Sequence, residues 1–206
     1  MADQNVILIG GNVTWHKYYD PGTKLWTSMR VRLQLDEKLG NSTWIDIRVN
    51  GEKQINGRHL KSVLNHLETT TYKKLSVVGS YVQRKQADGT IIDSIRASIT
   101  DVQPISDDFN STINTVLLKG RVERIMPDNG VVYIQTSFFN PKKAKDGEDG
   151  WDRRLIPAVC REESIISPDI NDVKQGQQAI LVGHLHGTTP SGKEQLHVEP
   201  SMLTIF

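Results

Sequence analysis

The sequence predicts an all-β protein of two tandem five-stranded barrels, because it repeats one pattern of strands. Residues 5–13 (NVILIGGNV) return as residues 114–122 (NTVLLKGRV). The run at 77–82 and the hairpin that follows it are likewise repeated from residue 181 onward. The copies lie roughly 105 to 110 residues apart, which is the size of one small domain. We therefore expect a first domain at 1–105, a short polar linker at 106–112 and a second domain at 113–206.

Three strands are expected to open the first copy. Residues 6–13 form an apolar run rich in β-branched side chains, and residues 29–35 and 44–49 alternate apolar with polar positions. An alternation of period two indicates a strand with one buried face and one outward face. The outward positions of the second and third strands carry Arg30, Arg32, Asp46 and Arg48.

A helix and two more strands complete the first copy. Leucine and valine residues at helical spacing predict a helix over residues 56–70, and strands are expected around 75–84 and 91–102. A small barrel needs this order of elements when a helix fills the gap between its third and fourth strands. The commonest natural barrel of this kind is the OB fold, which is therefore the fold predicted for both copies.

The second copy follows the same plan with one difference. Its helix is expected to shrink to at most a short turn, because Pro168 interrupts the stretch at 162–173. The strands expected here are 115–124, 130–139, 153–160 and a final hairpin from residue 178 to the end.

Composition excludes several classes of protein. The chain has 206 residues, of which 37% are hydrophobic and 24% charged, as in ordinary globular proteins. Its apolar runs are far shorter than the roughly 20 residues of a membrane-spanning helix. The N-terminus does not have the pattern of a signal peptide, so we expect a cytoplasmic protein. The single cysteine, Cys160, ends an apolar run and is expected to be a small core residue.

No catalytic constellation is present in the sequence, so neither an enzyme nor a cofactor is expected. The histidines of the last hairpin are the one arrangement that suggests a metal. If that hairpin turns at Pro190-Ser191, His184 lies opposite His197, with His186 on the same face. Three histidines could bind zinc, but no fourth ligand is evident and no metal is expected.

Charge is distributed unevenly between the two copies. Residues 1–105 hold 14 Lys and Arg against 10 Asp and Glu, whereas residues 106–206 hold 11 against 14. Phosphate contacts come from clustered Lys and Arg, so the first copy is the better candidate for binding a polyanion. A solvated surface of mixed charge is the alternative interpretation.

Aromatic and basic residues are interleaved between Trp15 and Trp26. Unpaired bases stack on flat aromatic rings while Lys and Arg contact the phosphates, so this composition is typical of a site for single-stranded nucleic acid. The alternative is that the rings of Trp15 and Trp26 close the barrel end or lie in a subunit interface.

The second copy carries its own aromatic and basic cluster at the two ends of a long hairpin extension. Phe138 and Phe139 precede Lys142 and Lys143, and Trp151 follows an acidic loop. Such an extension could fold over a strand of DNA. The acidic residues between 146 and 152 would repel phosphate, so a non-binding loop is the alternative.

Several of these segments resemble the single-stranded DNA-binding proteins of bacteria and their phages. The resemblance rests on residues 5–10, on 44–49, and on 75–82 with the Arg84-Lys85 pair that follows. It covers nearly all of the first copy and, more faintly, the second. It implies an OB fold, oligomeric or cooperative binding of single-stranded DNA, and no enzymatic activity.

The chain departs from that family at particular positions. Asn50 stands where the family usually has a stacking phenylalanine, Gln86 stands where it usually has a tryptophan, and Trp44 matches a stacking position. The last residues, 201–206, match the last strand of the first copy rather than the family's acidic tail, so recruitment of partners through such a tail is not expected. Because family members commonly join four OB domains, a two-domain chain is expected to form a homodimer.

We therefore expect a protein that binds and protects single-stranded DNA, largely without sequence preference, during DNA replication, recombination or repair in a bacterial or phage-infected cell. The alternatives are an OB-fold protein-interaction or replisome accessory module and a single-stranded RNA-binding protein. The residues expected to bind nucleic acid are Trp15, Lys17, Tyr18, Tyr19, Lys24, Trp26, Arg30, Arg32, Trp44, Arg48, Arg84, Lys85, Phe138, Phe139, Lys142, Lys143, Trp151, Arg153 and Arg154.

Overall fold

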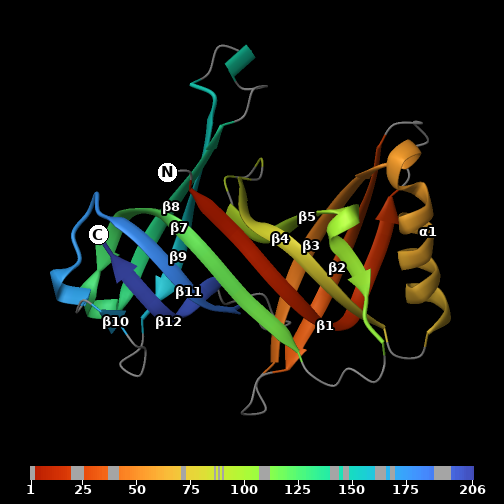
Figure 1. Cartoon of the computed structure of the whole chain (residues 1–206), viewed down its shortest axis with the longest axis horizontal. Helices are drawn as coiled ribbons and strands as arrows, with labels where there is room; N and C mark the ends of the chain where they lie inside the picture. The colour runs from red at the N-terminus through yellow and green to blue at the C-terminus, as the bar shows by residue number, and fades with distance from the viewer. Residues whose placement is uncertain are drawn as a thin grey trace. The chain divides into compact units, whose positions relative to one another are not determined.

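The computed structural model consists mostly of β-strands, with helix α1 between the third and fourth of them (Figure 1). It describes residues 3–19, 26–36, 42–70, 73–85, 87, 89, 91–106, 112–139, 144–145, 149–160, 166–167, 170–187 and 196–206. This confirms the predicted all-β, OB-type fold class. The elements are β1 (Gln4–Tyr19), β2 (Trp26–Asp36), β3 (Ser42–Glu52), α1 (Lys53–Thr69), β4 (Lys74–Lys85), β5 (Ile91–Ser98), β6 (Val102–Pro104), β7 (Ile113–Met126), β8 (Val131–Phe139), β9 (Trp151–Val159), β10 (Ile166–Ser167), β11 (Gln178–His186) and β12 (His197–Ile205).

The chain forms two compact units. One consists of Ile7–Asn114 and Gly187–Leu196 and contains most of β1 and the elements from β2 to β6. In this unit, β1 pairs with β2, β2 with β3, and β3 runs parallel to β5. β5 then pairs with β4, and β4 returns to β1, so the pairings close into a ring. Alternate residues such as Ile9, Leu33 and Ile95 point into the ring and are fully buried.

The other unit consists of Met1–Val6, Thr115–His186 and His197–Phe206. Its strands pair in the order β7, β8, β9, β12, β11, and β11 returns to β7. This is the same order of pairing as in the first ring, including a parallel contact between the third and fifth strands. β8 and β9 form a long antiparallel hairpin that extends beyond the rest of the unit (Figure 1).

Glycines at equivalent positions of the two units allow close approach between strands. An added Cβ on Gly11 would lie 2.3 Å from the carbonyl oxygen of Gln34, and one on Gly120 would lie 2.2 Å from that of Gln135. The glycines of β4 and β11 are crowded too: an added Cβ would lie 2.6 Å from the Ile95 side chain at Gly79 and 2.3 Å from the Glu199 carbonyl oxygen at Gly183. Only glycine, which has no Cβ, permits neighbouring strands to approach this closely.

The structure extends or divides several of the expected elements. β1 continues past residue 13 to Tyr19, through a bulge between Val13 and Trp15. A bulge re-aims the following side chains, which is why simple alternation did not reveal the longer strand. The strand expected at 91–102 ends at Ser98, and a 3₁₀ turn at Ile99–Asp101 separates it from β6.

The helix expected over 56–70 forms and begins slightly earlier, at Lys53. In the stretch where the second copy was expected to hold at most a short turn, the described residues form β10 and a 3₁₀ turn at Ile170–Asp172. None of the described helices is long and apolar enough to span a membrane.

Cys160 lies in the core, as expected, and burial raises the pKa of its thiol to about 11. The thiolate is the reactive form, so little of it exists at neutral pH. We expect Cys160 to react slowly with a thiol-specific reagent at pH 8 in the folded protein and rapidly once denaturant unfolds it. Equal rates of labelling in the two states would contradict this placement.

Candidate nucleic-acid interface

The outer surface of β1, β2, β3 and β5 carries most of the sequence-predicted binding residues that the structure describes. Side chains alternate across each of these strands, so the neighbours of a buried residue point outward. Arg30, for example, is exposed between Met29 and Val31, which are each 1% exposed. We call this surface the outer face.

A row of four cations crosses the outer face from strand to strand. Lys17 on β1 is opposite Arg30 on β2, and Arg30 is opposite Arg48 on β3. The parallel pairing of β3 with β5 then places Arg96 beside Arg48. Neighbouring strands lie about 4.8 Å apart, so the four backbone positions span roughly 14 Å. We call Lys17, Arg30, Arg48 and Arg96 the basic row.

The sequence patterns did not identify Arg96 as a candidate binding residue. Nothing in its own segment distinguishes it from any other outward arginine, because its significance depends on the register between β3 and β5. That register is parallel and joins positions 48 residues apart in the chain. The available signal was the outward position of Arg96 between Ile95 and Ala97, both of which are buried.

The basic row is electrostatically unfavourable by itself. Like charges directly opposite one another on adjacent strands destabilise a sheet, and here the contact is repeated across three pairs of strands. Tyr19 offsets part of this repulsion, because the Lys17 Nζ lies 5.1 Å and the Arg30 guanidinium carbon 5.9 Å from its ring centroid. A polyanion would relieve the repulsion more fully.

Aromatic residues flank the basic row on the same face. Trp15 is opposite Arg32 and is 46% exposed, and Tyr19 is opposite Ser28 and is 37% exposed. Trp44 is half-buried and pairs with Gln34. Each of these rings therefore has some area available on the side that carries the cations.

Tyr18 does not join these rings. It is opposite Met29, whose side chain is buried, so Tyr18 lies on the inward side of β1. The structure therefore brings together Trp15, Lys17 and Tyr19 but separates Tyr18 from them.

Arg32 is held by a carboxylate on the outer face. Its Nε lies 2.6 Å from Oδ1 of Asp46 and its terminal nitrogen 2.9 Å from Oδ2, which makes a bidentate ion pair between β2 and β3. The hydrogen bond to Asp46 raises the pKa of the guanidinium further above its ordinary value. An acidic side chain therefore already occupies the donors of Arg32 that would fit a phosphate.

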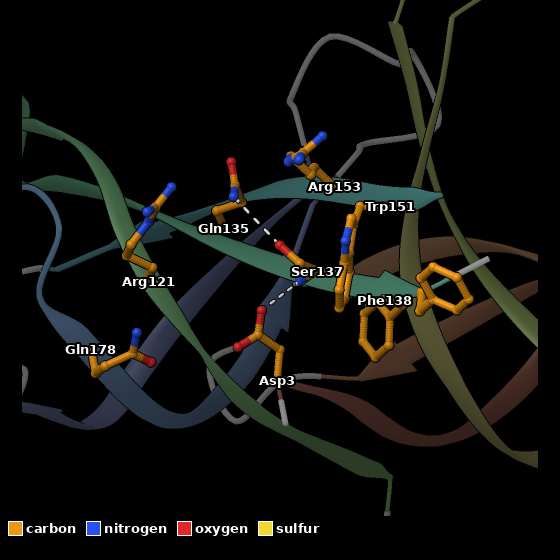
Figure 2. Close-up of a pocket in the computed structure, with 9 residues that line it drawn as sticks. Asp3, Arg121, Gln135, Ser137, Phe138, Trp151, Arg153 and Gln178 are labelled. Atoms are coloured by element: carbon orange, nitrogen blue, oxygen red, sulfur yellow. Dashed lines mark hydrogen bonds between the residues drawn. The ribbon is translucent and has the colours of Figure 1, made fainter. Parts of the chain in front are cut away.

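A groove of about 560 Å³ lies within the second unit, on the outer surface of the β7–β8–β9 sheet (Figure 2). It combines two arginines, polar side chains and exposed rings with the carboxylate of Asp3. Asp3 Oδ2 accepts a hydrogen bond of 2.7 Å from the backbone N–H of Ser137. The lining residues are Asp3, Arg121, Gln135, Ser137, Phe138, Phe139, Trp151, Arg153 and Gln178.

Two rings mark one end of this groove. Phe139 and Trp151 are paired across β8 and β9, with ring centroids 5.5 Å apart in an edge-to-face arrangement. Gly150 has a φ of +76°, and a Cβ there would meet the Phe139 ring at 2.7 Å. Phe139 and Trp151 remain 56% and 43% exposed, so the pair can accept a further planar group.

Both arginines that line the groove interact with nearby carboxylates. Arg153 forms a 2.6 Å ion pair with Asp149, and Arg121 lies 3.3 Å from Glu123. Arg154 projects from the alternate side of β9, with its guanidinium carbon 5.3 Å from the Phe138 ring centroid. The groove is thus less basic than the outer face.

The histidines of the last hairpin differ in register from the expected arrangement. His186, not His184, is opposite His197, and His184 is opposite Glu199. The expected pairing of these two strands was therefore wrong by two residues. In the part of the chain that the structure describes, no group of His, Cys, Asp or Glu is arranged to hold a metal ion.

Six of the predicted binding residues fall on parts of the chain without a described side chain. Lys24, Lys142 and Lys143 lie outside the described residues, and so do the side chains of Trp26, Arg84 and Lys85.

The ring of pairings, with its parallel contact between third and fifth strands and its helix after the third strand, defines an OB-type fold. Among solved structures, the chain is similar to the single-stranded DNA-binding protein of Thermus aquaticus. The wild-type protein gives a TM-score of 0.61 at 16% identity, over 100% of this chain and 94% of that one. A deletion mutant of the same Thermus protein gives 0.63 at 16% identity, over 100% and 95%.

Sequence comparison adds nothing to this likeness. No model of a protein family matches the chain, and no curated protein sequence matches it. The similarity to the Thermus protein is therefore a similarity of fold.

Proposed function

We propose that the chain binds single-stranded DNA on the outer face of β1, β2, β3 and β5, without enzymatic activity. The observation that carries this proposal is the basic row, in which four cations stand side by side across four strands. Neighbouring cations repel one another, and the phosphates of a nucleic-acid backbone offset that repulsion. The similarity in fold to a single-stranded DNA-binding protein supports the same conclusion.

In this proposal, the two kinds of side chain on the outer face have separate roles. The basic row contacts successive phosphates, and Trp15, Tyr19 and Trp44 stack on unpaired bases. Stacking requires bases that are free of a partner strand, so the exposed rings favour single-stranded over duplex nucleic acid. Neither role reads base identity, so the binding is largely independent of sequence.

We further propose that the second unit is a diverged copy of the first and has a binding surface of its own in its groove. The equal order of strand pairing and the crowded glycines at Gly11 and Gly120 support a common origin. Phe139 and Trp151 would stack on a base, with Arg153 beside them. A homodimer of such chains would present four OB domains, and its roles would lie in DNA replication, recombination or repair in the bacterial or phage-infected cytoplasm.

Titration of the intrinsic tryptophan fluorescence tests this function. We expect oligo-dT to quench the emission, with an apparent affinity that falls as salt rises. Duplex DNA of the same length should bind much more weakly, because its bases are not free to stack. Absence of quenching by oligo-dT, oligo-U and duplex alike at low salt would instead favour an OB-fold interaction module. Tighter binding of oligo-U than of oligo-dT would favour RNA as the ligand.

Replacing the two exposed rings of β1 tests the stacking role. We expect Trp15→Ala combined with Tyr19→Ala to weaken oligo-dT binding by on the order of 1 to 3 kcal/mol for each ring that stacks. Fluorescence anisotropy of labelled oligo-dT measures this affinity without relying on the tryptophan that is removed. Phe206→Ala is the control, since it removes an exposed ring outside the outer face. A folded double variant with unchanged affinity would refute the assignment of these rings.

A further inference from the structure

Asp46 occupies a central position among the cations of the outer face. It is opposite Arg32 and lies two residues before Arg48 on the same strand. Both of its carboxylate oxygens contact the Arg32 guanidinium, at 2.6 and 2.9 Å. The side chains of Arg32 and Asp46 are 41% and 55% exposed, so the pair is open to solvent and to any ligand on this face.

The contact between Arg32 and Asp46 has the geometry by which arginine also binds phosphate. A guanidinium presents two parallel N–H donors, which fit the two oxygens of a carboxylate or of a phosphate equally well. An exposed ion pair contributes little stability, so exchange of the carboxylate for a phosphate would cost the fold little. The carboxylate thus occupies an arginine that points toward the surface where phosphates are proposed to bind.

We infer that Asp46 lowers the affinity of the outer face for a phosphate backbone by occupying Arg32 in place of a phosphate. This inference rests on the proposed function and adds a residue that limits binding. Two effects act together: Arg32 is unavailable until the carboxylate is displaced, and the negative charge of Asp46 opposes phosphates that contact the neighbouring Arg48. Single-stranded DNA then binds through the basic row while Arg32 stays engaged.

Substitution of Asp46 by asparagine is expected to strengthen binding. Asp46→Asn keeps the size of the side chain but removes its charge, which frees Arg32 to contact one more phosphate. A unit charge about 7 Å from a phosphate changes the affinity by about threefold even in a medium as polar as water. We therefore expect oligo-dT to bind at least about threefold more tightly at low salt. One added phosphate contact should also steepen the slope of log K against log salt by about 0.7.

The experiment measures oligo-dT binding across a salt series for the wild type, Asp46→Asn, Arg32→Ala and the double variant. A steeper slope in Asp46→Asn that is abolished when Arg32→Ala is added, together with a gain in affinity that Arg32→Ala reduces, would support the inference. Glu68→Gln, on the exposed side of α1, is the control for the loss of one negative charge elsewhere. It should leave the salt slope unchanged.

The possible failures of this experiment are distinguishable. If the wild type binds oligo-dT but Asp46→Asn binds equally or more weakly, Asp46 does not limit binding and the inference is overturned. A gain in Asp46→Asn that is equally large without Arg32, with no change in the salt slope, would also overturn it, because the effect would then be one of charge alone. If the wild type does not bind oligo-dT even at low salt, the proposed function itself fails. Thermal unfolding of each variant confirms that it is folded.

Discussion

Arg30→Ala combined with Arg96→Ala is expected to weaken binding of oligo-dT by on the order of 2 to 4 kcal/mol near neutral pH and low salt. The two arginines belong to the basic row but are separated by Arg48, so the double substitution removes two distinct sites for phosphate. The slope of log K against log salt should fall by about 1.4, or about 0.7 for each phosphate that is no longer neutralised. Anisotropy of labelled oligo-dT in a salt series measures both quantities.

The same substitutions should not destabilise the fold. Arg30 and Arg96 are both exposed, and each faces the like charge of Arg48, so their removal relieves repulsion within the sheet. The matched control is Arg58→Ala with Lys61→Ala, which removes two exposed positive charges from α1. If this control weakened binding as much as the removal of Arg30 and Arg96, net charge rather than the basic row would be responsible.

Gly120→Ala is expected to destabilise the protein by about 1 to 3 kcal/mol or more. A methyl group at this position would meet the carbonyl oxygen of Gln135 at 2.2 Å, and that atom belongs to the backbone of β8. Relief of the clash requires β7 and β8 to separate, which weakens the pairing between them. Thermal or urea unfolding measures the decrease in stability, which corresponds to several degrees in Tm for a chain of this size.

Gly57→Ala provides the contrasting substitution. Gly57 lies within α1, and an added Cβ would meet nothing within 4 Å. Alanine favours the helix over glycine, so this variant should gain about 0.5 to 1 kcal/mol. Equal effects of the two substitutions, or a Gly120→Ala variant as stable as the wild type, would contradict the close approach of β7 and β8.

The fold class could be predicted from the sequence because the relevant signals are local. Period-two alternation at 29–35 and 44–49 predicted β2 and β3, and helical spacing predicted α1. The extension of β1 to Tyr19 could not be predicted in this way, because a bulge interrupts the alternation and its last residues are polar or aromatic. Such a strand is specified by its pairing with β2 and not by its own composition.

The candidate site was predictable in composition but not in arrangement. Sequence position identified Lys17, Arg30 and Arg48 as candidate cations, and their alternation with apolar residues predicted outward side chains for the last two. Alternation could not place them in one row, because cross-strand register depends on turns and on bulges that the alternation within a strand does not reveal. For the same reason Arg96 was missed and Tyr18 was grouped with Trp15, although the two lie on opposite sides of β1.

Single-stranded DNA bound as we propose lies across the outer face of β1, β2, β3 and β5. Photo-crosslinking of oligo-dT carrying 5-iododeoxyuridine, followed by mass spectrometry of the labelled peptides, locates the bound strand. We predict crosslinks at Trp15, Tyr19 or Trp44, reduced by high salt and by removal of Arg30 and Arg96. Crosslinks confined to peptides of α1, or none at a concentration that saturates binding, would contradict the claim.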